Sequence, residues 1–206
     1  MLRKIVPIVV VLALAFGILG ISLFTCAEAR YSFNVKNTNS LPTEKPKAVD
    51  YFFPYAGRIQ PDNSLWYFKA FRDKLWYGLT FNSGKKAELL LLFADKRLIL
   101  ARDLFIKGKP EIALSTLTKA EKYLEEAYLK EEENRKGGQD TVSFLVKLAT
   151  AALKHREVIR GIVEIAPDDA KPEIIKIENY PKNVYKTLRD ILNSKGVLAP
   201  ENPFED

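Results

Sequence analysis

Apolar residues recur at alternating steps of four and three in two consecutive stretches of this chain. The first stretch comprises Ala87, Leu91, Ala94, Leu98, Ala101 and Phe105, and the second comprises Ala113, Leu117, Ala120, Leu124 and Ala127. Because an α-helix turns once every ~3.6 residues, this heptad spacing keeps the apolar side chains on one face over many turns. Gly108 and Pro110, between the stretches, are typical of a helix end and of the next helix's first residue. The pattern therefore predicts two long helices paired as an antiparallel hairpin.

The other periodic segments also favour helices. Five apolar residues spaced three or four apart share one side of an amphipathic helix, and we expect that side to face the core. They are Leu65, Phe68, Phe71, Leu75 and Leu79. Residues 142–166 predict a helix whose apolar side is interrupted by Arg156, and residues 173–194 predict two short helices joined at Tyr180-Pro181.

No segment shows the apolar-polar alternation of a half-buried strand. We therefore predict an all-α fold. It is an antiparallel helical bundle of four to six helices built on the long hairpin, preceded by an N-terminal signal or anchor helix and an extended linker.

The first 29 residues predict an export segment. Arg3 and Lys4 precede an uncharged apolar run over residues 5–24, and residues 27–29, Ala-Glu-Ala, have the small-x-small form that signal peptidase cleaves. The run is also long enough to span a bilayer uncleaved. A third alternative makes Cys26 a lipid-anchored cysteine. In each case the positive-inside rule places the chain after this segment outside the cytoplasm.

Composition divides the chain into four parts. We expect a signal peptide or membrane anchor over residues 1–29, a proline-containing linker over 30–62, a helical bundle domain over 63–196 and a C-terminal tail over 197–206. An aromatic cluster over residues 51–55 is too apolar to stay in water, so we expect it to pack against the helices.

The chain offers few groups for catalysis or metal binding. One Cys and one His among 206 residues exclude a disulfide within the chain and most zinc or iron–sulfur sites. We expect His155 at the edge of the bundle. We expect acidic residues such as Asp95 and Glu121 in solvated faces or ion pairs, and Arg97 partly buried against an acidic partner. We therefore predict no catalytic residue, no cofactor and no metal.

The basic charge does not indicate a nucleic-acid partner. The formal net charge is +6, but charges of both signs alternate along the predicted helices instead of forming a basic stripe. Export also argues against nucleic acid.

Aromatic residues crowd residues 66–81 beyond what one core-facing stripe needs. They can pack against the aromatic cluster at 51–55, or form a surface for a protein partner, a glycan or the membrane interface. The candidate partner surface consists of Trp66, Lys69, Arg72, Trp76 and Tyr77.

Short motifs in the first half of the chain resemble a known family. They are Pro54-Tyr55-Ala56-Gly57-Arg58-Ile59-Gln60-Pro61-Asp62, then Leu65, Lys69, Arg72-Asp73-Lys74-Leu75 and Ala94-Asp95-Lys96-Arg97-Leu98. They resemble an exported bacterial helical domain family of unknown function, in which a proline–aspartate turn leads into a short aromatic helix and a long hairpin. The resemblance covers residues 51–130 approximately. It implies the fold and export, and it adds no chemistry because that family has no assigned catalytic residue.

Together these observations predict a non-catalytic helical module, exported or membrane-tethered, that mediates protein interaction at the bacterial cell envelope. The alternative is a small envelope hydrolase or ligand-binding protein with a site of carboxylates and aromatic residues. The expected partners are the membrane, through residues 5–24 if they are not cleaved, and an envelope protein. The sequence leaves the oligomeric state open.

Overall fold

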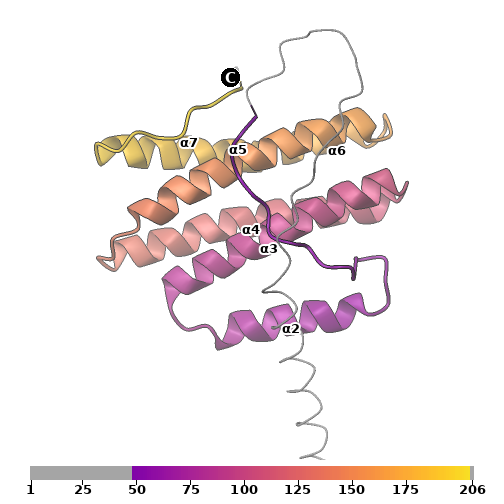
Figure 1. The fold of residues 1–206 in the computed structure, drawn as a ribbon, viewed down its shortest axis with the longest axis horizontal. Helices are drawn as coiled ribbons and strands as arrows, with labels where there is room; N and C mark the ends of the chain where they lie inside the picture. Colours follow the sequence, from indigo (N-terminus) through magenta and orange to yellow (C-terminus); the bar gives the residue numbers. More distant parts are fainter. Residues whose placement is uncertain (1–47, 205–206) are drawn as a thin grey trace, which may run out of the picture. The chain divides into compact units, whose positions relative to one another are not determined.

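The computed structural model describes residues 48–204, and these residues form helices and connecting segments with no strand. In chain order the helices are α2 (Trp66–Leu79), α3 (Ser83–Ile106), α4 (Pro110–Lys136), α5 (Val142–Ile165), α6 (Lys171–Ile177) and α7 (Asn179–Ser194). Figure 1 shows α2 at one edge of this stack, then the α3–α4 hairpin, then α5 and α7. The predicted all-α class is confirmed. The predicted export segment over residues 1–29 lies outside the described residues.

Helices α3 and α4 form the hairpin that the heptad spacing predicts. The apolar residues at the predicted contact positions of both helices are buried. Gly108 has a φ of +68°, and Pro110 is the first residue of α4. A left-handed backbone ends α3, and proline starts α4 where a helix needs no N–H donor. Asn82 caps α3 by accepting from the backbone N–H of Lys85.

The apolar core consists of two clusters along the hairpin. The first packs the beginning of α3 and the end of α4 against the beginning of α5 and against α7. The second packs the end of α3 and the beginning of α4 against the end of α5 and against α6. Because α5 crosses both clusters, the side chains in its middle lie between them.

The junction between the last two helices lies at a different position from the one predicted. Helices α6 and α7 meet at Glu178, ahead of the expected Tyr180-Pro181 junction. Pro181 lies in the first turn of α7 and is buried there. First-turn N–H groups have no partner within the helix, so a proline at this position removes no helical hydrogen bond.

The amphipathic helix predicted from the spacing of Leu65 to Leu79 is present as α2, but the prediction of which side faces the core is wrong. Phe68 and Phe71, expected inside, are 74% and 67% exposed, whereas Asp73 is buried. Instead α2 lies over a part of α3 that presents Arg97 and Phe93, and the rings of Trp66 and Trp76 contact those two residues.

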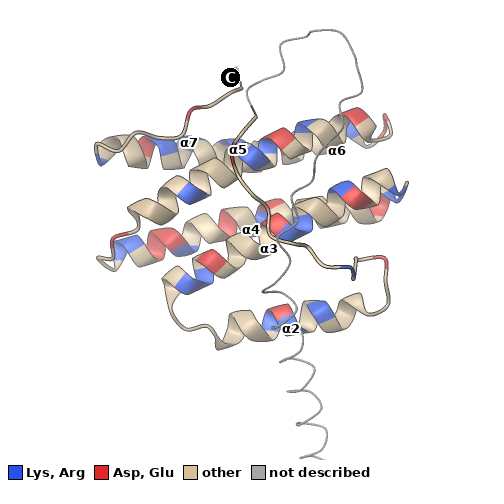
Figure 2. Cartoon of the chain, viewed as in Figure 1, with Lys and Arg blue, Asp and Glu red and all other residues tan. Residues whose placement is uncertain are grey.

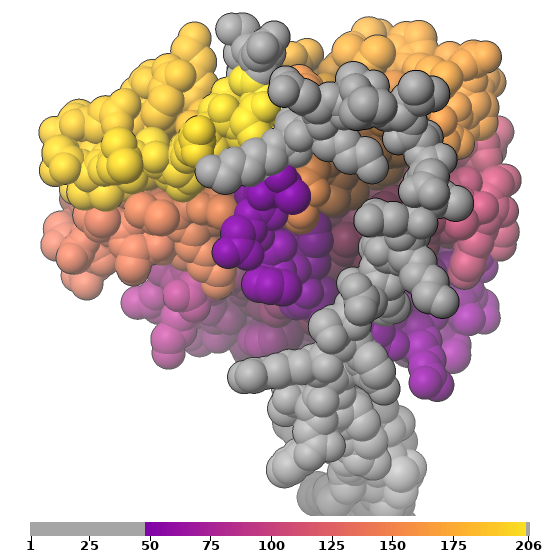
Figure 3. Space-filling model, turned by 45° about the horizontal axis from the view of Figure 1, so that its top comes forward, coloured from indigo at the N-terminus to yellow at the C-terminus, as the bar shows by residue number. Residues whose placement is uncertain are grey.

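The two ends of the described chain pack against α5 and α7. The backbone N–H of Val49 donates to Glu157 at 2.8 Å, and Tyr185 of α7 donates to the carbonyl of Pro200 at 2.7 Å. Figure 3 shows the first described residues, in indigo, beside the C-terminal residues, in yellow. Among α2 to α7, no helix is long and apolar enough to cross a membrane.

Candidate functional site

Three charged side chains from three helices meet between the two apolar clusters. His155 of α5 lies with Nδ1 2.9 Å from Oε1 of Glu121 on α4, and with Nε2 3.0 Å from Oδ1 of Asp95 on α3. All three side chains are almost completely buried. We call Asp95, Glu121 and His155 the buried ionic centre. It connects α3, α4 and α5 by polar contacts in the region between the two apolar clusters.

The segment before α2 covers the buried ionic centre. The hydroxyl of Tyr51 donates to Oδ2 of Asp95 at 2.7 Å. The ring of Phe53 lies 5.8 Å from the imidazole of His155 and 5.5 Å from the ring of Tyr51. The prediction that the 51–55 cluster packs against the helices is confirmed for Tyr51 and Phe53, whereas Phe52 is exposed.

The surroundings of His155 determine its protonation state. Burial by itself lowers the pKa of an imidazole, but the carboxylates of Glu121 and Asp95 outweigh burial and raise the pKa of His155 to about 9. At neutral pH the ring is therefore an imidazolium, and both of its nitrogens donate to carboxylates. Burial and the neighbouring Asp95 raise the pKa of the Tyr51 hydroxyl, which stays protonated and keeps donating.

The expectation that His155 lies at the bundle edge is wrong, because its side chain is fully buried. Asp95 and Glu121 are ion-paired, which is one of the two expected alternatives, but they pair with His155 of another helix in the interior and not on a solvated face. A sequence signal for this burial exists. Asp95 directly follows Ala94 and Glu121 directly follows Ala120, and both alanines are contact positions of the hairpin. Residues next to a heptad contact position border the partner helix.

The buried ionic centre links three helices through charged contacts. A catalytic acid or base must come within hydrogen-bond distance of a substrate, but these groups are closed off by their neighbours. Oε2 of Glu121 has no hydrogen-bond partner among the described residues, so part of the cost of burying this carboxylate is not offset. Within residues 48–204, no group of three or more His, Cys, Asp or Glu side chains is arranged to hold a metal ion.

This protonation state predicts a pH dependence of stability. The folded-state pKa of about 9 for His155 lies above the unfolded value of 6.5. The stabilisation by the imidazolium is therefore fully present below pH ~6.5 and is lost as the pH rises through ~9. Urea titrations of wild type and His155→Leu measure this effect. We expect the difference between their free energies of unfolding to shrink from about pH 6 to about pH 9.5, a range that spans both pKa values.

The comparison between variants is needed because another group titrates in the same range. Burial lowers the pKa of Lys69 to about 8, so this residue changes stability in the opposite direction above that pH. Lys69 is present in both proteins and cancels in the difference. A difference that stays constant across the range would contradict a charged His155.

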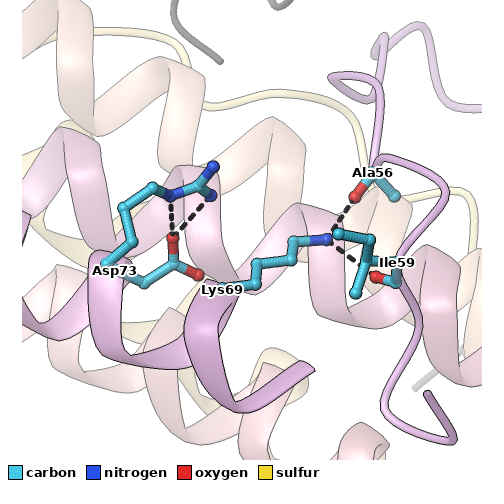
Figure 4. Close-up of polar contacts among 5 residues, drawn as sticks. Ala56, Ile59, Lys69 and Asp73 are labelled. Atoms are coloured by element: carbon cyan, nitrogen blue, oxygen red, sulfur yellow. Dashed lines mark hydrogen bonds and ion pairs between the residues drawn. The ribbon is translucent and has the colours of Figure 1, made fainter. Parts of the chain in front are cut away.

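The structure places the five residues of the candidate partner surface on α2, most of them turned toward the body. The ammonium of Lys69 donates to the carbonyls of Ala56 at 2.7 Å and Ile59 at 3.1 Å, and Figure 4 shows these contacts beside the Arg72–Asp73 pair. Tyr77 lies 5.1 Å from the ammonium of Lys86. Whether these residues bind a partner stays a prediction.

Trp66 belongs to a set of rings around Arg97. The Arg97 guanidinium lies 4.5 Å from the ring centre of Tyr123 on α4 and 5.7 Å from that of Trp66 on α2. Arg97 is buried as expected, but the contacts that the structure gives it among the described residues are aromatic rings instead of an acidic partner. These contacts attach α2 to the hairpin through the side of the helix that lies opposite Phe68 and Phe71.

The opposite side of α2 is an exposed apolar surface. Half of the large apolar side chains that the described residues expose lie between residues 65 and 81. Phe68, Phe71, Leu75 and Leu79 follow one another at steps of three and four, so they share one side of the helix. We call these four residues the outer face of α2. Figure 2 shows that α2 carries few charges, which are grouped near its middle and one end.

A segment anchored to the hairpin turn precedes α2. Lys109, at the start of α4, pairs with Asp62 at 2.6 Å, and Lys107 bonds to Gln60. The proline–aspartate turn at residues 61–62 thus packs where α3 turns into α4. The described residues define a class of small all-helical domain. It consists of a turn, an aromatic helix, a long hairpin and a following helix that completes a buried ionic centre.

The chain belongs to the family described as a domain of unknown function (DUF5667), whose family model matches residues 58–169. The match includes α2 to α5 and all three residues of the buried ionic centre. It confirms the predicted resemblance to a family of unknown function and extends it beyond residue 130. No curated protein and no solved structure matches this chain.

Proposed function

We propose that this chain is a non-catalytic helical module, tethered to the bacterial cytoplasmic membrane, that binds another component of the cell envelope. The observation that carries the proposal is the outer face of α2, with Phe68 and Phe71 more than two-thirds exposed on a well-packed body. Single exposed apolar residues are common on any protein surface. A continuous exposed apolar surface is uncommon and is typical of an interaction site.

The polar chemistry of the body supports binding over catalysis. The envelope hydrolase that the sequence leaves open needs a carboxylate that touches substrate. Asp95 and Glu121 are the most buried carboxylates near the middle of the body, and both are paired with His155 behind Tyr51 and Phe53. Their arrangement stabilises the scaffold that presents α2.

The tether rests on the sequence of residues 5–24, which is apolar over a bilayer-spanning length and follows two basic residues. Cell fractionation of the host, with mass measurement of the purified chain, tests it. We expect the chain in the membrane fraction after an alkaline carbonate wash, with a mass that includes residues 1–29. A soluble chain that begins at Arg30 would contradict the tether.

A further inference from the structure

We infer that the outer face of α2 lies on the anionic phospholipid surface of the membrane that holds the N-terminus. This inference rests on the proposed tether and names the envelope component that α2 contacts. The argument uses the composition of α2, the placement of its charges, the way it is attached and the length of chain before the body.

The composition of α2 suits the boundary between lipid and water. Phe68, Phe71, Leu75 and Leu79 form its apolar side, and Trp76 at the border of that side is 41% exposed. Helices that lie in the plane of a membrane interface combine an apolar side of Phe, Leu and Trp with basic flanks, and Trp and Tyr favour the headgroup level. The outer face projects from the body as one side of a helix, a shape that can lie on a flat lipid surface.

The charges of α2 favour an anionic surface. The helix contains three basic residues and one acidic residue. Lys74 is exposed and follows Phe71 by three residues, so an ammonium borders this ring, whereas the guanidinium of Arg72 is paired with Asp73 at 2.8 Å. The one acidic residue, Asp73, is buried on the opposite side. Two copies of this face would bring like charges together, whereas lipid phosphates attract them.

The inner side of α2 is occupied by specific contacts. Lys69 bonds to the carbonyls of Ala56 and Ile59, and Trp66 contacts the Arg97 guanidinium. Rotating the helix to bury Phe68 and Phe71 would break these contacts and expose Trp66. The apolar side is therefore held outward by the fold, and it is available to a surface without rearrangement of the body.

The chain before the body allows α2 to reach the bilayer. The 23 residues over 25–47 separate the predicted anchor from the described residues. An extended chain spans at most ~3.5 Å per residue, so this segment reaches no further than about 80 Å. A tether of this length keeps α2 at a millimolar effective concentration near the membrane, where a weak interfacial contact is populated.

The two tryptophans of the chain, Trp66 and Trp76, both lie on α2, so tryptophan emission reports on this helix alone. We propose to reconstitute the full chain into vesicles of phosphatidylglycerol and phosphatidylcholine that carry bromine on the acyl chains near the headgroup. We expect bromine to quench the emission. Quenching should weaken in pure phosphatidylcholine and at high salt, because ions screen the attraction.

Variants of exposed residues test the face without disturbing the core. Phe68→Gln with Phe71→Gln should lower the ratio of docked to undocked α2 at least about tenfold, because two large apolar groups no longer enter the lipid. Lys74→Glu should lower it at least about fivefold in anionic vesicles. As a matched control, Leu129→Gln with Ile165→Gln replaces two exposed apolar residues of α4 and α5, each 46% exposed, and should leave quenching unchanged.

The outcomes separate this inference from the proposed tether. A chain that floats with vesicles while its emission is not quenched, or is quenched equally in the double phenylalanine variant, would overturn the inference and leave the tether standing. A chain that does not float with vesicles would overturn the tether. A blue-shifted but unquenched emission, in a sample whose mass in detergent corresponds to two chains, would assign the face to a second copy and overturn the lipid contact.

Discussion

Replacing His155 by leucine is expected to lower the free energy of unfolding by about 3–5 kcal/mol, the range for breaking a buried ionic group by removing one partner. Leucine is apolar and has a volume similar to that of histidine. The loss of stability therefore reports on the missing charge more than on a cavity. Asp95 and Glu121 would then face each other, buried, without the imidazolium that both contact at 3.0 and 2.9 Å. Urea unfolding of the full chain, followed by far-UV circular dichroism in one mild detergent, measures the change.

Removing the unpaired charges should restore part of that stability. In a chain with His155→Leu, Asp95→Asn and Glu121→Gln, the buried groups are neutral, and Asp95→Asn keeps an oxygen that accepts from Tyr51. We expect the triple variant to be more stable than His155→Leu alone. Lys130→Leu serves as a control, because it breaks an exposed pair with Glu133 that contributes under about 1 kcal/mol. If His155→Leu costs no more than Lys130→Leu, the centre does not stabilise the fold as described.

Leu117→Ala is the second change with a large expected effect. Leu117 is fully buried where α4 meets α3, in a cluster whose other members from α3, α4, α5 and α6 are themselves almost completely buried. Truncating a buried leucine costs about 2–5 kcal/mol, and the cost is larger where the surroundings cannot collapse. We expect a value in the upper half of this range from the same urea titrations.

Leu129→Ala is the matched control for the hairpin, because it makes the same chemical change on the same helix at a position that is 46% exposed. It should cost well under the loss at Leu117, since half of the side chain already contacts water. Equal losses at the two positions would mean that the α3–α4 contact is not the main apolar interface of the body.

The effects at His155 and Leu117 have different origins. Leu117 lies in the second apolar cluster, and the buried ionic centre lies between the two clusters. The apolar residues at the contact positions supply the contact area between α3 and α4. The imidazolium of His155 instead fixes the position of α5 along these two helices. Both contribute to a firm support for α2, whose own contacts with the hairpin are made by a few side chains.

The sequence determined the hairpin because the forces involved are local or repeat along the chain. The heptad spacing in residues 87–127 requires a partner helix along the whole length, and Gly108 and Pro110 fix where one helix ends and the next begins. The same holds for α5, where Arg156 is the single polar break in an apolar side. The residues that carry the family resemblance are likewise visible in the sequence.

Only the tertiary structure decided the buried ionic centre and the direction of α2. Asp95, Glu121 and His155 come from three helices, and only the register between those helices brings their atoms within 3.0 Å. In α2 the spacing of Phe68 and Phe71 shows that the helix has an apolar side, but not which way that side points. Its direction follows from the contacts of the other side, where Lys69 bonds to two backbone carbonyls and Trp66 contacts Arg97.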